Sequence, residues 1–102
     1  MKYTKRARLA AAGWKVGSAS EFLGLDAEEA AFVDLKVALS QSLRQWRTRQ
    51  RLTQGELAKR LRSSQSRVAK MEAADRTVSV DLLVRSLFKL GAKPKDIARA
   101  IA

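Results

Sequence analysis

The sequence predicts a compact all-α bundle, and three of its features support this fold class. The chain has 102 residues, the size of one domain, and is 46% hydrophobic, which is enough for one buried core. Only five glycines and one proline are available for turns, while residues that favour helices are abundant. Serine, threonine and aspartate residues, which cap helices, precede several of the apolar segments.

The first helix signals are two capping boxes, in which an N-cap side chain and an acid three residues later each bond the other's backbone N–H. Ser18 with Glu21 and Asp26 with Glu29 fit this pattern. A long helix should therefore follow Asp26 and run to about Gln50. Apolar residues at three- and four-residue spacing predict its buried face: Phe32, Leu35, Leu39, Leu43 and Trp46.

A second, smaller apolar stripe on the same helix consists of Ala30, Val33 and Val37. It could pack against the N-terminal segment of the same chain, which contains Trp14. It could also contact a protein partner or a second copy of the chain. The sequence leaves these alternatives open.

Two short helices should come next. Thr53 with Glu56 is a third capping box and predicts a helix from Gln54 to about Leu61. Ser64 then caps a helix that should begin at Gln65 and end near Ala73. The two helices are separated by a tight turn.

Two further helices complete the predicted bundle. Ser79 should cap a helix with a strongly apolar face, and Gly91 should end it. Pro94 suits the first turn of a last helix, because the N–H that proline lacks has no partner there. The chain from Asp26 onward should thus contain five helices.

The charge of the chain indicates a polyanionic partner. The formal net charge is +11, and such an excess on a small domain is typical of nucleic-acid binding. The charge is unevenly spread: the segment Ser18–Ser42 has five acids and one base, whereas Arg44–Lys70 has nine bases and one acid. We therefore expect two surfaces with different partners.

Composition excludes several kinds of chemistry. The chain has no cysteine and no histidine, so it has no disulfides, no thiolate or imidazole metal ligands and no histidine acid–base catalyst. The Ser86-x-x-Lys89 pattern of serine acyl enzymes arises easily by chance and has no second motif here. We expect no enzyme, no cofactor and no metal site. The apolar run Leu9–Ala12 is too short for a signal peptide or a membrane span, which predicts a cytoplasmic protein with no membrane contact.

Two short helices joined by a tight turn and surrounded by bases have the layout of a helix-turn-helix. The segments Leu52–Leu61, Ser64–Glu72 and Ser79–Leu83, followed by Leu90-Gly91, resemble the XRE (Cro/C1-type) repressor domain. The resemblance implies a lambda-repressor-like domain over residues 27–102, with the motif at about residues 53–73. Residues 1–26 would be an N-terminal helical extension packed on the domain.

The resemblance also implies a function. The protein would be a sequence-specific transcriptional repressor that binds a palindromic double-stranded operator as a homodimer, on the bacterial nucleoid. The segment 22–30 resembles the HigA-like antitoxin subgroup, which adds a small RelE/HigB-like toxin as partner and autoregulation of the shared operon. Two alternatives are a free-standing Cro-like regulator without a toxin and a small basic RNA-binding protein. Single-strand RNA binders usually expose aromatic residues, which here are expected mostly on core faces.

The resemblance assigns DNA contacts to both motif helices. Gln54, at the start of the first, would hold a phosphate with its amide and the neighbouring backbone N–H groups. The exposed face of the second would read the major groove through Gln65, Ser66, Arg67 and Lys70. Glutamine pairs well with adenine and arginine with guanine, although phosphate contacts remain an alternative for Arg67 and Lys70.

Three further residues complete the predicted site. Arg76, just after the second motif helix, would meet a phosphate. Arg47 and Glu72 would form a structural salt bridge that fixes the angle of the recognition helix, rather than contacting DNA themselves. The alternative for this pair is two unrelated surface charges.

The chain departs from the family at three turn positions. Family members usually have glycine where this chain has Arg51, Arg62 and Ala74, and glycine adopts the left-handed backbone region without steric cost. A side chain there costs ~1–2 kcal/mol. Either these turns are built differently, or the strain is accepted and Arg51 and Arg62 add positive charge.

Overall fold

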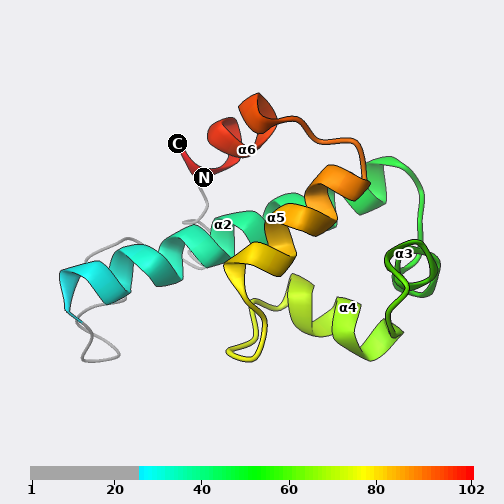
Figure 1. Ribbon diagram of the computed structural model, residues 1–102, viewed down its shortest axis with the longest axis horizontal. Coiled ribbons are helices and arrows are strands. Elements are labelled where there is room, and N and C mark those ends of the chain that lie inside the picture. The colour runs from blue at the N-terminus through cyan, green and yellow to red at the C-terminus, as the bar shows by residue number, and fades with distance from the viewer. Residues whose placement is uncertain (1–25) are drawn as a thin grey trace.

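Five helices make up the part of the chain that the computed structural model describes, residues 26–102 (Figure 1). They are α2 (Ala27–Arg49), α3 (Gln54–Leu61), α4 (Gln65–Glu72), α5 (Val80–Lys89) and α6 (Pro94–Ile101). The described residues form no strand, so the predicted all-α fold is confirmed. None of these helices is both long enough and apolar enough to cross a membrane.

Two of the predicted capping boxes set the starts of α2 and α3. The Asp26 carboxylate accepts from the Glu29 N–H at 2.7 Å, and the Glu29 carboxylate accepts from the Asp26 N–H at 3.2 Å. At α3 the Thr53 hydroxyl accepts from the Glu56 N–H at 3.0 Å, and the Glu56 carboxylate accepts from the Thr53 N–H at 2.7 Å. The backbone N–H and hydroxyl of Thr53, in that order, hold the pKa of Glu56 below its ordinary value.

The remaining helix starts also follow the sequence signals. The Ser64 hydroxyl accepts from the Arg67 N–H at 3.1 Å, and the Ser79 hydroxyl accepts from the Leu82 N–H at 3.0 Å. Pro94 occupies the first position of α6. The predicted box at Ser18, the position of Trp14 and the packing of the N-terminal extension lie outside the described residues.

The core forms where α2 packs against α4, α5 and α6, and α3 closes it from one end. Its fully buried large side chains come from all helices except α6: Leu39, Leu43, Leu57, Val68, Met71, Leu83 and Leu87. Trp46 and Leu35 are half-buried against this core, as predicted. The predicted buried face of α2 is therefore confirmed from Leu35 onward.

The prediction is wrong at Phe32, whose side chain is 53% exposed. α2 has 23 residues and is ~34 Å long, whereas α5, which packs along it, has 10 residues. The N-terminal part of α2 accordingly extends past α5 (Figure 1). On the second stripe, Ala30 is fully buried, and Val33 and Val37 are half-buried.

The three unusual turn positions all adopt the left-handed backbone region. Among the described residues other than glycine, positive φ occurs at Arg51 (58°), Arg62 (55°) and Ala74 (54°). These are the three positions at which the sequence departs from the glycine expected from the resemblance. The turns therefore have left-handed geometry with side chains in place, and the strain is present. Of the two alternatives, the structure adopts strained left-handed turns that carry side chains, and not turns built differently.

Candidate nucleic-acid interface

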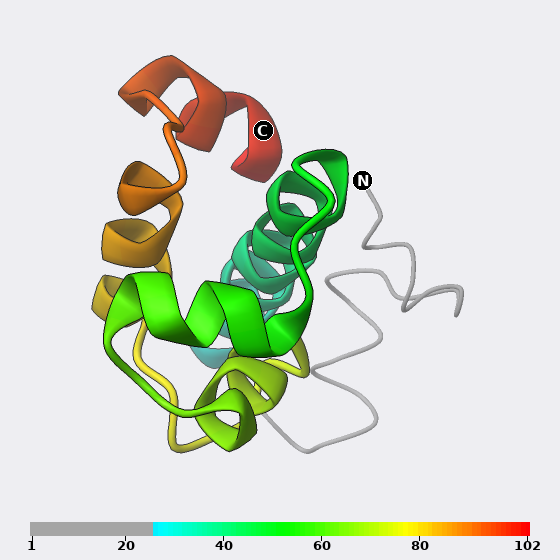
Figure 2. The ribbon, with the colours of Figure 1, turned by 90° about the vertical axis from the view of Figure 1, so that its right-hand side faces the viewer.

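Each of the two motif helices exposes one side to solvent. Leu57 and Ala58 of α3 and Val68 and Met71 of α4 point into the core, so the opposite sides of both helices face solvent. Figures 1 and 2 place α3 and α4 on one side of the bundle, with α6 on the other side of α2 and α5. The two short helices thus form a surface of their own.

The residues predicted to read bases lie together on α4. Gln65, Ser66, Arg67 and Lys70 are all exposed, while Val68 and Met71 between them are buried, as the helical spacing predicts. A polar hollow of about 330 Å³ runs beside this face, between α4 and the loop that follows it. Its lining residues are Ser64, Ser66, Arg67, Lys70, Thr77 and Val78.

The loop after α4 carries Arg76 in a fixed turn. The Asp75 carboxylate accepts from the Thr77 hydroxyl at 2.7 Å and from the Thr77 N–H at 2.9 Å. These two hydrogen bonds, the hydroxyl first, hold the pKa of Asp75 below its ordinary value. The same two bonds close the turn around Arg76. Arg76 is exposed between these two residues, next to the hollow that Thr77 lines.

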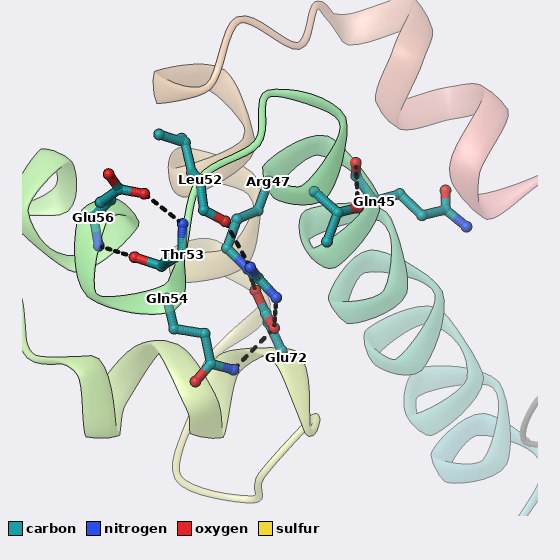
Figure 3. A network of polar contacts seen from close by, with 8 residues as sticks. Gln45, Arg47, Leu52, Thr53, Gln54, Glu56 and Glu72 are labelled. Atoms are coloured by element: carbon teal, nitrogen blue, oxygen red, sulfur yellow. Dashed lines mark hydrogen bonds and ion pairs between the residues drawn. The ribbon is translucent and has the colours of Figure 1, made fainter.

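Arg47 and Glu72 lie together, as predicted, and form a bidentate ion pair (Figure 3). Arg47 Nε donates to Glu72 Oε2 at 2.5 Å, and Arg47 Nη2 donates to Glu72 Oε1 at 3.1 Å. The side chains are only 12% and 6% exposed. Arg47 Nη1 also donates to the Leu52 carbonyl at 2.7 Å, which ties the turn between α2 and α3 to the same guanidinium.

Gln54 joins this network, a contact that sequence reasoning missed. Its Nε2 donates to Glu72 Oε1 at 3.1 Å, so the side chain predicted to hold a phosphate also bonds the C-terminal end of α4 (Figure 3). The half-buried side chain keeps one amide hydrogen and its oxygen for other partners. No local signal could have revealed a contact between residues 18 positions apart.

The arginines divide into two groups. Those held by the protein are Arg47, Arg60, Arg85 and Arg99, which donate to side-chain acceptors, and Arg49, whose guanidinium lies 5.2 Å from the centre of the Trp46 ring. Within residues 26–102, no hydrogen bond or ion pair occupies the guanidinium groups of Arg44, Arg51, Arg62, Arg67 and Arg76. Four of these five lie in or next to the α3–α4 motif, where they offer free charge to a polyanion.

Comparison with known proteins agrees with this geometry. A family model described as a helix-turn-helix domain matches residues 38–100, which include the C-terminal half of α2, all of α3 to α5, and α6 except its last residue. This span is more than half of the chain. No curated protein and no solved structure matches the chain. Within the part of the chain that the structure describes, no cluster of acidic residues is suited to hold a metal ion.

Replacing Arg47 by alanine should destabilise the protein strongly. The change leaves the nearly buried Glu72 carboxylate without its cationic partner, with only the neutral Gln54 amide as donor, and the Leu52 carbonyl without the Arg47 donor. Breaking a buried ion pair costs ~3–5 kcal/mol. Urea unfolding followed by circular dichroism measures the decrease in stability. The matched control is Arg85→Ala, which removes the ion pair of Arg85 with Asp81. These two side chains are 73% and 74% exposed, so the change should cost at most ~1 kcal/mol of stability. Equal decreases in the two variants would contradict a structural role for Arg47.

Proposed function

The chain belongs to the helix-turn-helix domain family of DNA-binding proteins, and we propose that it is a sequence-specific repressor that binds a palindromic operator as a homodimer. The observation that carries this proposal is the exposed face of α4, which presents Gln65, Ser66, Arg67 and Lys70 while Glu72 anchors the same helix to α2. Members of such a family are not in general enzymes, and the face carries groups that bind rather than react.

In this proposal α4 lies in the major groove. The Arg67 guanidinium, free of protein partners within residues 26–102, can donate two parallel hydrogen bonds to guanine, and the Gln65 amide can pair with adenine. Ser66 lies between them, and Lys70 follows one turn later, within reach of a base or a phosphate. Gln65 and Arg67 supply most of the sequence preference in this proposal.

The ends of α3 and α4 position the domain on the DNA backbone. Gln54 and the free N–H groups at the start of α3 can bind a phosphate, because a helix N-terminus attracts anions. Arg76, in the closed turn after α4, can hold a second phosphate on the other side of the recognition helix. Phosphate contacts of this kind fix the register of α4 without selecting the sequence.

A second role, as the antitoxin of a toxin–antitoxin pair, is favoured by the opposite end of α2. Asp26, Glu28 and Glu29 are exposed there beside the exposed ring of Phe32. Because α3 follows the other end of α2, this acidic end lies ~34 Å along the helix from the motif. A small basic RelE/HigB-like toxin could bind it while α4 remains on DNA. A free-standing regulator would lack this second partner.

Selection from a random duplex library tests the main proposal. The native protein should enrich one palindromic motif, and Arg67→Ala should lose preference at one base position per half-site, at a cost of ~1–3 kcal/mol. Gln54→Ala should weaken binding to all sequences alike. The matched control, Arg99→Ala on α6, should select the native motif. Native protein that enriches no motif, or binds single-stranded RNA more tightly than duplex DNA, would contradict the proposal.

Co-purification tests the antitoxin role. Tagged native protein should retain the product of the reading frame encoded directly beside it, and Glu28→Lys/Phe32→Ala should release that product because the variant removes an acidic and an aromatic side chain from the proposed toxin surface. Arg67→Ala should retain it. If no neighbouring product binds the native protein, the free-standing regulator is correct. If the folded Glu28→Lys/Phe32→Ala variant retains the product, the toxin binds elsewhere.

A further inference from the structure

Arg51 and Arg62 flank helix α3, one at each end, and both hold a backbone conformation that arginine rarely adopts. Their φ angles are 58° and 55°. Arg51 lies two residues before the Thr53 N-cap, and Arg62 is the C-cap of α3. Left-handed backbone at a residue other than glycine, asparagine or aspartate is uncommon and tends to occur at functional sites.

Both turns demand this conformation, so the side chains cannot relieve it. The Arg51 N–H donates to the Thr48 carbonyl at 3.0 Å, and the Arg62 N–H donates to the Lys59 carbonyl at 3.2 Å. These hydrogen bonds close the ends of α2 and α3. Glycine would satisfy them equally well and without the clash between Cβ and the following carbonyl.

Neither guanidinium makes a polar contact within the described part of the fold. Both side chains are exposed, and within residues 26–102 neither guanidinium has a hydrogen-bond or ion-pair partner. Arg47, by contrast, is almost buried in its pair with Glu72. Within residues 26–102, the strain at Arg51 and Arg62 is therefore not offset by any hydrogen bond or ion pair of their guanidinium groups.

The free charges lie beside the proposed DNA-binding residues. Arg62 and Arg67 line the same open groove of about 450 Å³ between α4 and α5, and Arg51 is three residues before Gln54. In the proposed complex α3 crosses the DNA backbone, so an arginine at each of its ends can reach a phosphate.

We propose that Arg51 and Arg62 are DNA-phosphate ligands, and that this binding role accounts for arginine at two backbone positions suited to glycine. The inference rests on the proposed function, because it requires α3 and α4 to face duplex DNA. Each arginine adds non-specific affinity and no base preference.

Glycine substitutions test this inference, because they separate strain from charge. Arg51→Gly and Arg62→Gly should each raise Tm by a few degrees through relief of strain, yet weaken binding to a fluorescent mixed-sequence DNA duplex several-fold. The plot of log K against log salt should become shallower by about 0.9 for each phosphate that the variant no longer neutralises. Arg51→Lys and Arg62→Lys keep the charge and should keep the native slope.

Ala74→Gly is the matched control, since Ala74 has the same backbone conformation, with φ of 54°, and no charge. It should raise Tm in the same way and leave both affinity and salt slope unchanged. A glycine variant of Arg51 or Arg62 that binds the duplex with the affinity and salt slope of the native protein would overturn the assignment of that residue. As long as the native protein itself binds the duplex, the proposed function would remain intact. Native protein that does not bind the duplex would overturn both.

Discussion

The ion pair between Arg47 and Glu72 joins α2 to α4, and we expect the orientation of α4 to depend on it. Through one guanidinium, α2 is bonded to the end of α4 and to the carbonyl of Leu52 in the α2–α3 turn, and the same carboxylate accepts from Gln54 at the start of α3. Three helices and a turn thus meet at two nearly buried charges. Each partner satisfies the other, so neither can be removed without leaving a buried charge unpaired.

This arrangement links stability to function. Hydrophobic contacts of Val68 and Met71 hold α4 on the core, but such contacts are not directional and tolerate small rotations of a short helix. The bidentate hydrogen bonding at Glu72 is directional, and we expect it to fix the rotation of α4. Because Gln54 shares this carboxylate, one hydrogen-bond network joins the proposed phosphate ligand on α3 to the helix that carries the proposed base readers.

Electrostatics divides the rest of the surface. One group of arginines forms side-chain hydrogen bonds, ion pairs or a cation–π contact with the protein. The arginines whose guanidinium groups have no such partner in residues 26–102 lie mostly in or next to α3 and α4. The acidic first turn of α2 lies at the other end of that helix from the motif. A domain with a high positive charge can in this way bind a polyanion at one place and keep a different surface for a protein partner.

The sequence predicted the helices well because their starts are set locally. The capping boxes at Asp26 and Thr53 and the caps at Ser64 and Ser79 involve residues three positions apart, and all four are present. Longer-range features were harder. The exposure of Phe32 follows from the unequal lengths of α2 and α5, which helical periodicity does not report.

The site was predictable only in part. The pairing of Arg47 with Glu72 came from resemblance to a family, since the residues are 25 positions apart. The hydrogen bond from Gln54 to Glu72 could not be read from sequence at all. The left-handed turns at Arg51 and Arg62 were one of two alternatives, because a residue that rarely adopts such a backbone gives no signal of its own.

The most direct test of the central claim is an amide NMR titration of the native protein with a DNA duplex of mixed sequence. If the unit held by Arg47 and Glu72 is the binding surface, the largest shifts should fall at the start of α3, on α4 and in the loop containing Arg76, with α6 almost unchanged. Shifts concentrated on α6 or on the acidic first turn of α2, with α4 unaffected, would contradict this account.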